Sequence, residues 1–204
     1  MLESAALETR RAFGLLFLCV SIAVAAAAIV SELAYLNSAP LFYHAIIWLG
    51  SFGAVFGAAA PTLRKVAPSI KGRMKTSIRW SGPAKILNGL CWAGPFVAIA
   101  AVPSLYQYLI LLGIGLGNLS TYLLVRRYSA KDNREQLIVA VISLAAIPAA
   151  VAIDTTLFAS AQDIAIMLSR ILIAVAYGAG GLFALMGTKA GPVGFDPTTS
   201  GSLQ

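Results

Sequence analysis

Arg170 is the residue whose type and position most clearly suggest chemistry. It lies within the apolar stretch 164–186, about 9 Å from its start at ~1.5 Å of rise per helical residue. A cation at that depth in a membrane is costly, so it usually faces a partner or a water-filled cavity. Asp163, Arg170 and Tyr177 recur every seven residues, which places them on one face of a helix. We expect this face to point into a helical bundle.

Two roles for Arg170 follow from this position. In the first, the side chain tilts toward the start of its helix and reaches the interface or a carboxylate. The carboxylates near the same membrane level, and therefore the candidate ion-pair partners, are Asp163, Asp154 and Glu32. In the second role, Arg170 binds or gates an anionic substrate. The residues expected to line such a path with it are Tyr177, Asn118 and His44.

The sequence argues against a metal or haem site. His44 is the single histidine, so bis-histidine haem ligation and multi-histidine metal sites within this chain are excluded. We interpret His44 and the carboxylates at its level as polar residues at helix ends. We therefore expect no metal and no cofactor.

Sequence patterns of known catalytic sites are also missing. The chain has no GxSxG, HExxH, Walker or dinucleotide-binding pattern. Cys19 and Cys91 lie in separate apolar stretches and form no CxxC pair. For chemistry on lipids, the side predicted to be cytoplasmic offers only Asp132 and Glu135 near a loop. We expect that the protein is not an enzyme.

The elements that must position these residues are predicted to be membrane-spanning helices. Of the 204 residues, 59% are hydrophobic and 11% are charged, and the mean hydropathy is +0.83. A soluble domain is nearer 45–50% apolar and roughly 25% charged. A spanning helix needs about 20 apolar residues. The six stretches that meet this length are 12–32, 41–61, 86–104, 105–125, 137–157 and 164–186. The predicted fold is a single all-α polytopic bundle.

Basic residues predict the orientation of this bundle. With six spans, fourteen of the fifteen Lys and Arg residues fall on one side, and Arg170 is the exception. Loops rich in Lys and Arg stay in the cytoplasm, so both termini are predicted there, in a multi-pass protein of the cell membrane. The net charge of +7 then reflects topology and attraction to anionic lipids. Because no nucleic-acid-binding signature is present, we expect no nucleic-acid partner.

The segment 62–85 is predicted to be a basic cytoplasmic loop that contacts lipid headgroups. A short interfacial helix within it is plausible because Ile70, Met74 and Ile78 recur every four residues. The basic residues expected to contact anionic headgroups are Arg64, Lys65, Lys71, Arg73, Lys75 and Arg79. Docking of a cytoplasmic partner is the alternative. Residues 187–204 are predicted to be a flexible cytoplasmic tail.

Glycines predict close helix contacts. Gly53 and Gly57 in the second span, and Gly113 and Gly117 in the fourth, form small-xxx-small motifs. Such motifs serve packing within a chain, a homo-oligomer or a complex with membrane partner subunits. Asn118 is also typical of a packing amide that bonds to a neighbouring helix.

Two functions remain open after these exclusions. The first is a transporter or channel for a small solute. Anions are the candidate substrates, because an intramembrane Arg170 could attract negative charge. The second is a non-catalytic accessory subunit of a larger membrane complex. It is favoured by the scarcity of buried ionisable groups and by the glycine-bearing faces. A polar cavity that reaches Arg170 would favour transport, whereas an ion pair in a solid core would favour the subunit.

Overall fold

The computed structural model describes residues 2–40, 42–75, 80–129, 133–157 and 161–187. Within these ranges the regular structure is helical throughout. The helices are α1 (Leu2–Leu36), α2 (Phe42–Met74), α3 (Gly82–Ala101), α4 (Tyr106–Ser129), α5 (Arg134–Leu157) and α6 (Gln162–Met186), with a short 3-10 turn, η2 (Pro103–Leu105), before α4. All six of these described helices are long and apolar enough to cross a membrane. The helical fold class predicted from the sequence is therefore confirmed.

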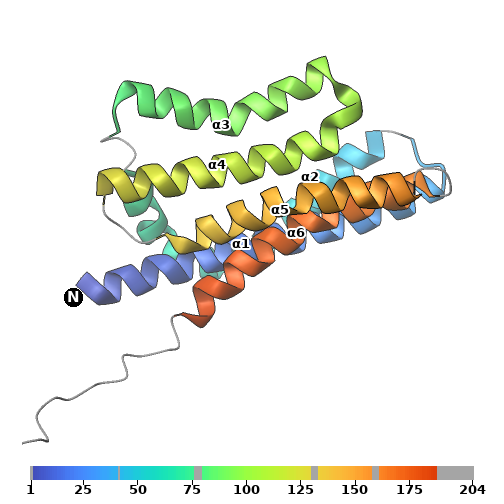
Figure 1. The fold of residues 1–204 in the computed structure, drawn as a ribbon. Coiled ribbons are helices and arrows are strands. Elements are labelled where there is room, and N and C mark those ends of the chain that lie inside the picture. Colours follow the sequence, from blue (N-terminus) through green and yellow to red (C-terminus); the bar gives the residue numbers. More distant parts are fainter. Residues whose placement is uncertain (1, 41, 76–79, 130–132, 158–160, 188–204) are drawn as a thin grey trace, which may run out of the picture.

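The helices pack in a series that differs from their order in the chain. α2 packs on α1, α1 on α6, α6 on α5, α5 on α4, and α4 on α3. Figure 1 shows the α3–α4 hairpin beside the other helices, with α2 behind α1 and α6. α2 and α3 are thus the two edges of the series. In the described part of the chain they do not pack along each other.

Successive helices run in opposite directions, which gives the molecule two distinct ends (Figure 1). The N-terminal end holds the start of α1, the end of α4 and the start of α5. The opposite end holds the turn from α1 to α2, η2, and the start of α6. The described basic residues outside α6 lie at or next to the helix ends that meet at the N-terminal end, which is the arrangement that the six-span prediction expects.

Small residues allow α1 and α6 to pack closely. A side chain at Gly181 would meet the Gly14 carbonyl oxygen at 2.9 Å, so no larger residue fits there without movement. The Ser21 hydroxyl donates a hydrogen bond of 2.7 Å to the Ala174 carbonyl oxygen across the same interface. In lipid, such close packing and interhelical hydrogen bonds are what hold helices together. This contact fixes the position of the α6 face that carries Arg170.

The structure differs from the sequence prediction after residue 61. The segment predicted to be a loop begins with thirteen further helical residues, because α2 continues through Pro61 and Pro68 to Met74. Each proline removes one backbone hydrogen bond without ending the helix. Ile70 packs against the main hydrophobic core, which stabilises this extension.

The extension displays the basic residues of the predicted lipid-contact set. The described side chains among them, Arg64, Lys65, Lys71 and Lys75, are all exposed. Arg79, the side chain of Arg73 and residues 188–204 of the predicted tail lie outside the described residues. A helical rod therefore carries these cations at the N-terminal end.

A small hydrophobic cluster anchors α3 to α4. Trp80, just before α3, is buried against Leu124 and Val125 near the end of α4. The Ser81 and Tyr128 hydroxyl oxygens lie 3.0 Å apart, within hydrogen-bonding distance. Together with the η2 turn, this cluster fixes both ends of the α3–α4 hairpin.

Candidate functional site

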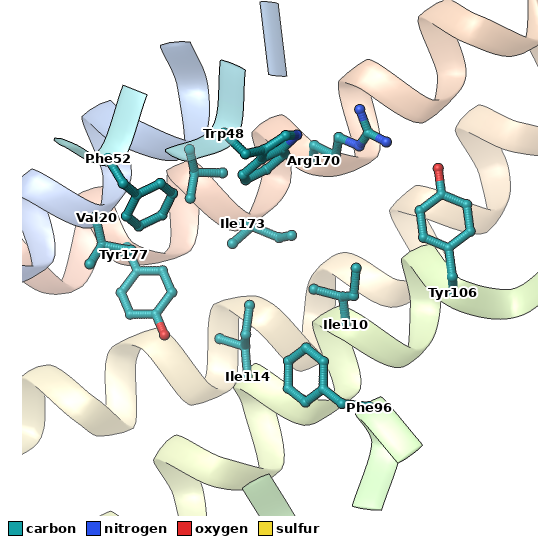
Figure 2. A pocket seen from close by; sticks show the side chains of 11 residues that line it. Val20, Trp48, Phe52, Phe96, Tyr106, Ile110, Ile114, Arg170, Ile173 and Tyr177 are labelled. Atoms are coloured by element: carbon teal, nitrogen blue, oxygen red, sulfur yellow. The ribbon is translucent and has the colours of Figure 1, made fainter. Parts of the chain in front are cut away.

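A cavity of about 460 Å³ lies between the edge helices and the centre of the bundle. It is partly open to the surroundings. Five helices contribute its lining residues, which are Val20, Val24, Trp48, Phe52, Phe96, Tyr106, Ile110, Ile114, Arg170, Ile173 and Tyr177. Figure 2 shows these side chains converging on one space from opposite sides.

The packing order of the helices creates this cavity. α2 follows α1 and supplies Trp48 and Phe52, whereas α3 follows α4 and supplies Phe96. Because α2 and α3 do not pack along each other in the described chain, the space between them is not filled by a direct helix contact. The face of α6 that carries Arg170 and Tyr177 forms one wall of the cavity (Figure 2).

Arg170 is half-buried and is the charged residue of the lining. Its guanidinium carbon lies 5.8 Å from the centre of the Trp48 ring, within the range of a cation–π contact. In Figure 2 the guanidinium points away from Tyr177, on the side of the view where Tyr106 lies. This direction agrees with the tilt of helical side chains toward the helix N-terminus. A cation thus sits at the margin of a mostly apolar cavity.

No ion pair joins Arg170 to Asp154 in the described part of the chain. Asp154 instead accepts a hydrogen bond of 2.7 Å from the Tyr108 hydroxyl. Glu32 is buried on α1. The side chain of Asp163 lies outside the described residues. Among the described residues, the Arg170 guanidinium contacts the aromatic ring of Trp48.

Tyr177 supplies a second polar group to the cavity, two turns from Arg170. Its ring packs edge-on against Phe17, with 5.4 Å between ring centres. Asn118 is 2% exposed and donates a hydrogen bond of 2.9 Å to the Ile114 carbonyl oxygen of its own helix. It is not a lining residue of the cavity.

His44 lies outside the lining. It is half-buried on α2, one turn before Trp48 on the same helix face. The described residues contain no group of three or more His, Cys, Asp or Glu side chains placed to hold a metal ion. Of the predicted substrate path, the structure therefore brings Arg170 and Tyr177 into one cavity, and neither Asn118 nor His44 is among the lining residues.

The two glycine motifs have different surroundings. A side chain at Gly113 would meet the Phe96 ring at 2.8 Å, and one at Gly117 would clash with the Trp92 ring. These glycines let α3 lie close to α4, which brings Phe96 to the cavity. Gly53 and Gly57 have no described neighbour within 4 Å of such a side chain. Their motif makes no close helix contact within the described chain.

Sequence reasoning missed the apolar residues of the site. Trp48, Phe52 and Phe96 define its walls, yet apolar side chains are expected throughout a membrane helix. One signal was present in the sequence: Trp48, Phe52 and Phe56 recur every four residues. The first two rings stack with 6.3 Å between their centres. That spacing marks an aromatic face of α2.

The fold and the site together define a class of protein: a helical protein with six described helices able to span a membrane and an internal cavity beside a cation. Comparisons with protein-family models, with curated proteins and with solved structures gave no match to this chain.

Proposed function

We propose that the protein is a membrane transporter that binds an anionic solute at Arg170. The observation that supports this function is that Arg170 lines a partly open cavity and contacts an aromatic ring there. A cation that served only to stabilise the bundle would be expected to pair with a carboxylate. Asp154, a described candidate, instead accepts a hydrogen bond from the Tyr108 hydroxyl.

The energetics favour an additional partner for the guanidinium. A cation–π contact contributes about 0.5–2 kcal/mol. A ring face accepts none of the five N–H donors that an arginine presents. An anion would accept several of them in charge-assisted hydrogen bonds, which are roughly twice as strong as neutral ones. A bound anion would therefore stabilise Arg170 in a way that Trp48 does not.

The proposed orientation follows from the charge distribution. Because basic segments remain in the cytoplasm, the N-terminal end is assigned to the cytoplasm and the opposite end to the exterior. α6 then begins outside, and Arg170 lies about two turns inward from its start. The substrate would first meet Arg170 from the outer half of the membrane. The exposed cations of α2 would contact anionic headgroups on the inner side.

The test is solute flux into liposomes that contain the purified protein. Candidate small anions would be supplied outside, and uptake would be compared for the wild type, Arg170→Gln and Arg170→Lys. We expect Arg170→Gln to lower uptake at least 10-fold and Arg170→Lys to retain part of it, because a charge remains. Arg127→Gln is the matched control, since it removes an exposed cation at the far end of α4. Equal uptake by all four proteins would overturn the proposal.

One observation favours the accessory-subunit alternative. The described part of α2 has no buried residue, and Gly50, Gly53 and Gly57 have no neighbour within 4 Å of an added side chain. Such a helix could receive a partner subunit or a second copy of this chain. Gentle extraction that always yields a stoichiometric partner, together with an absence of flux, would support this alternative.

A further inference from the structure

We propose, on the basis of the transport function above, that the substrate is a long-chain anion taken directly from the bilayer. Its class is an apolar chain that ends in a phosphate or carboxylate. The anionic group would bind Arg170, the chain would lie between Ile110 and Ile173, and the molecule would enter between α2 and α3.

The lining favours an amphiphile over a small hydrated anion. The cavity has eleven lining residues. Apart from Arg170 and Tyr177, the other nine carry mostly apolar side chains, and Tyr106 is the one of these nine with a hydroxyl. A small multiply charged anion would lose its water against these walls with one cation as compensation, and burial of a charge without partners is costly. An amphiphile places a single charged group beside Arg170 and its chain on the apolar walls. The volume of about 460 Å³ lies within the range of roughly 300–1,000 Å³ that is usual for small-molecule sites.

The opening of the cavity favours entry from the side. α2 and α3 flank it, and both are long and apolar enough to lie within the membrane. Phe96 lines the cavity and is nevertheless 42% exposed, so the described helices leave this wall partly uncovered. At this level of a membrane helix, the surroundings are lipid. A lipid-borne molecule would therefore reach the cavity without crossing water.

The two polar groups of the cavity fit the orientation of a lipid. Arg170 lies nearer the opposite end of the molecule, and Tyr177 lies about 10.5 Å deeper along α6 at ~1.5 Å per residue. Between them Ile173 and Val24 present apolar surface. A charged group held near the interface and a chain directed inward match this sequence of surfaces. In Figure 2 the guanidinium points away from Tyr177. In the orientation proposed above, a headgroup would lie on that side.

The experiment measures binding of radiolabelled dodecyl phosphate to the full chain in nanodiscs of uncharged phospholipid. Arg170→Gln tests the charge, and Ile110→Trp fills the cavity without changing charge. Val97→Trp is the matched control because Val97, next to Phe96 on α3, is 70% exposed. We expect saturable binding that weakens at least 10-fold in the first two variants and less than 2-fold in Val97→Trp. If Arg170→Gln fails to fold, Arg170→Lys is used in its place, because it keeps the charge and changes the geometry of the donor group.

Competition distinguishes the lipid from a free anion. Excess inorganic phosphate should not displace the probe, whereas unlabelled dodecyl phosphate should. Displacement by both at equal concentration, or equal binding by the wild type and Ile110→Trp, would overturn the inference. Arg170-dependent flux of a short anion without dodecyl phosphate binding would overturn the inference and leave the transport function standing. Saturable, Arg170-dependent binding without any flux would support the substrate class and contradict transport.

Discussion

Arg170 and Tyr177 lie two turns apart on one face of α6, and their side chains have different surroundings. The Arg170 guanidinium contacts the Trp48 ring at the outer margin of the cavity. The Tyr177 ring packs edge-on against the Phe17 ring. The seven-residue spacing predicted that the two residues share a face. It could not predict that Trp48, from another helix, would contact the cation, because nothing in the sequence specifies which helices become neighbours.

Glycines at the α3–α4 interface provide a prediction for single residues. We expect Gly117→Ala to lower the apparent melting temperature, because the new methyl group would clash with the Trp92 ring. Overpacking of this kind typically destabilises by about 1–3 kcal/mol. Gly53→Ala is the control, since its site has no described neighbour within 4 Å. Thermal unfolding in detergent would measure both variants, and an equal effect of the two would contradict the packing described here.

Helix positions could be predicted well from the sequence, whereas helix neighbours could not. Each predicted span overlaps one of the six described helices along most of its length, because lipid demands long apolar segments with internal hydrogen bonds. The third span was predicted to run to residue 104, whereas α3 ends at Ala101 and η2 begins at Pro103. Lipid-facing and core-facing surfaces are both apolar, so composition did not reveal that α2 and α3 form the edges. The cavity depends on that arrangement, and its apolar walls therefore escaped prediction. The partner of Asp154 also escaped prediction. The sequence suggested Arg170 as its partner, whereas in the structure Asp154 accepts a hydrogen bond from Tyr108, an uncharged residue of α4.

The extension of α2 gives a prediction for an element. Ile70 packs on the main core, so Ile70→Asn should loosen residues 62–74 of α2. We expect faster hydrogen–deuterium exchange of their backbone amides in nanodiscs, by roughly 5–30-fold for a loss of about one to two kcal/mol. Thr62→Asn, at an exposed position, should leave exchange nearly unchanged. Fast exchange of this segment already in the wild type would mean that the extension is not a stable helix.

The whole molecule presents two chemically different ends. The described cations outside α6 gather at the N-terminal end. They lie in the first part of α1, along the extension of α2, at the end of α4 and near the start of α5. The cavity with Arg170 lies toward the opposite end. This polarity was predictable from the sequence because short basic loops stay in the cytoplasm. An anion would thus bind on the side that carries few other cations. We therefore expect its affinity to depend mainly on Arg170 and little on the cations at the N-terminal end.

The orientation can be tested by cysteine labelling in intact cells. In a background without Cys19 and Cys91, Ser38→Cys should react with a membrane-impermeant maleimide, because the turn after α1 is assigned to the exterior. Arg127→Cys should react only after the membrane is permeabilised. Both sites are exposed in the structure. The reverse pattern would place the cavity toward the cytoplasm and contradict uptake from outside.

The central claim is that the Arg170 cavity holds an anionic amphiphile, and photo-crosslinking tests it most directly. An alkyl phosphate with a diazirine in its chain would be added to the protein in nanodiscs, irradiated, and mapped by mass spectrometry. The account predicts crosslinks to cavity residues such as Val24, Ile110 and Ile173, and their loss in Arg170→Gln. Crosslinks spread over lipid-facing residues such as Leu49 and Val97, unchanged by that substitution, would contradict it.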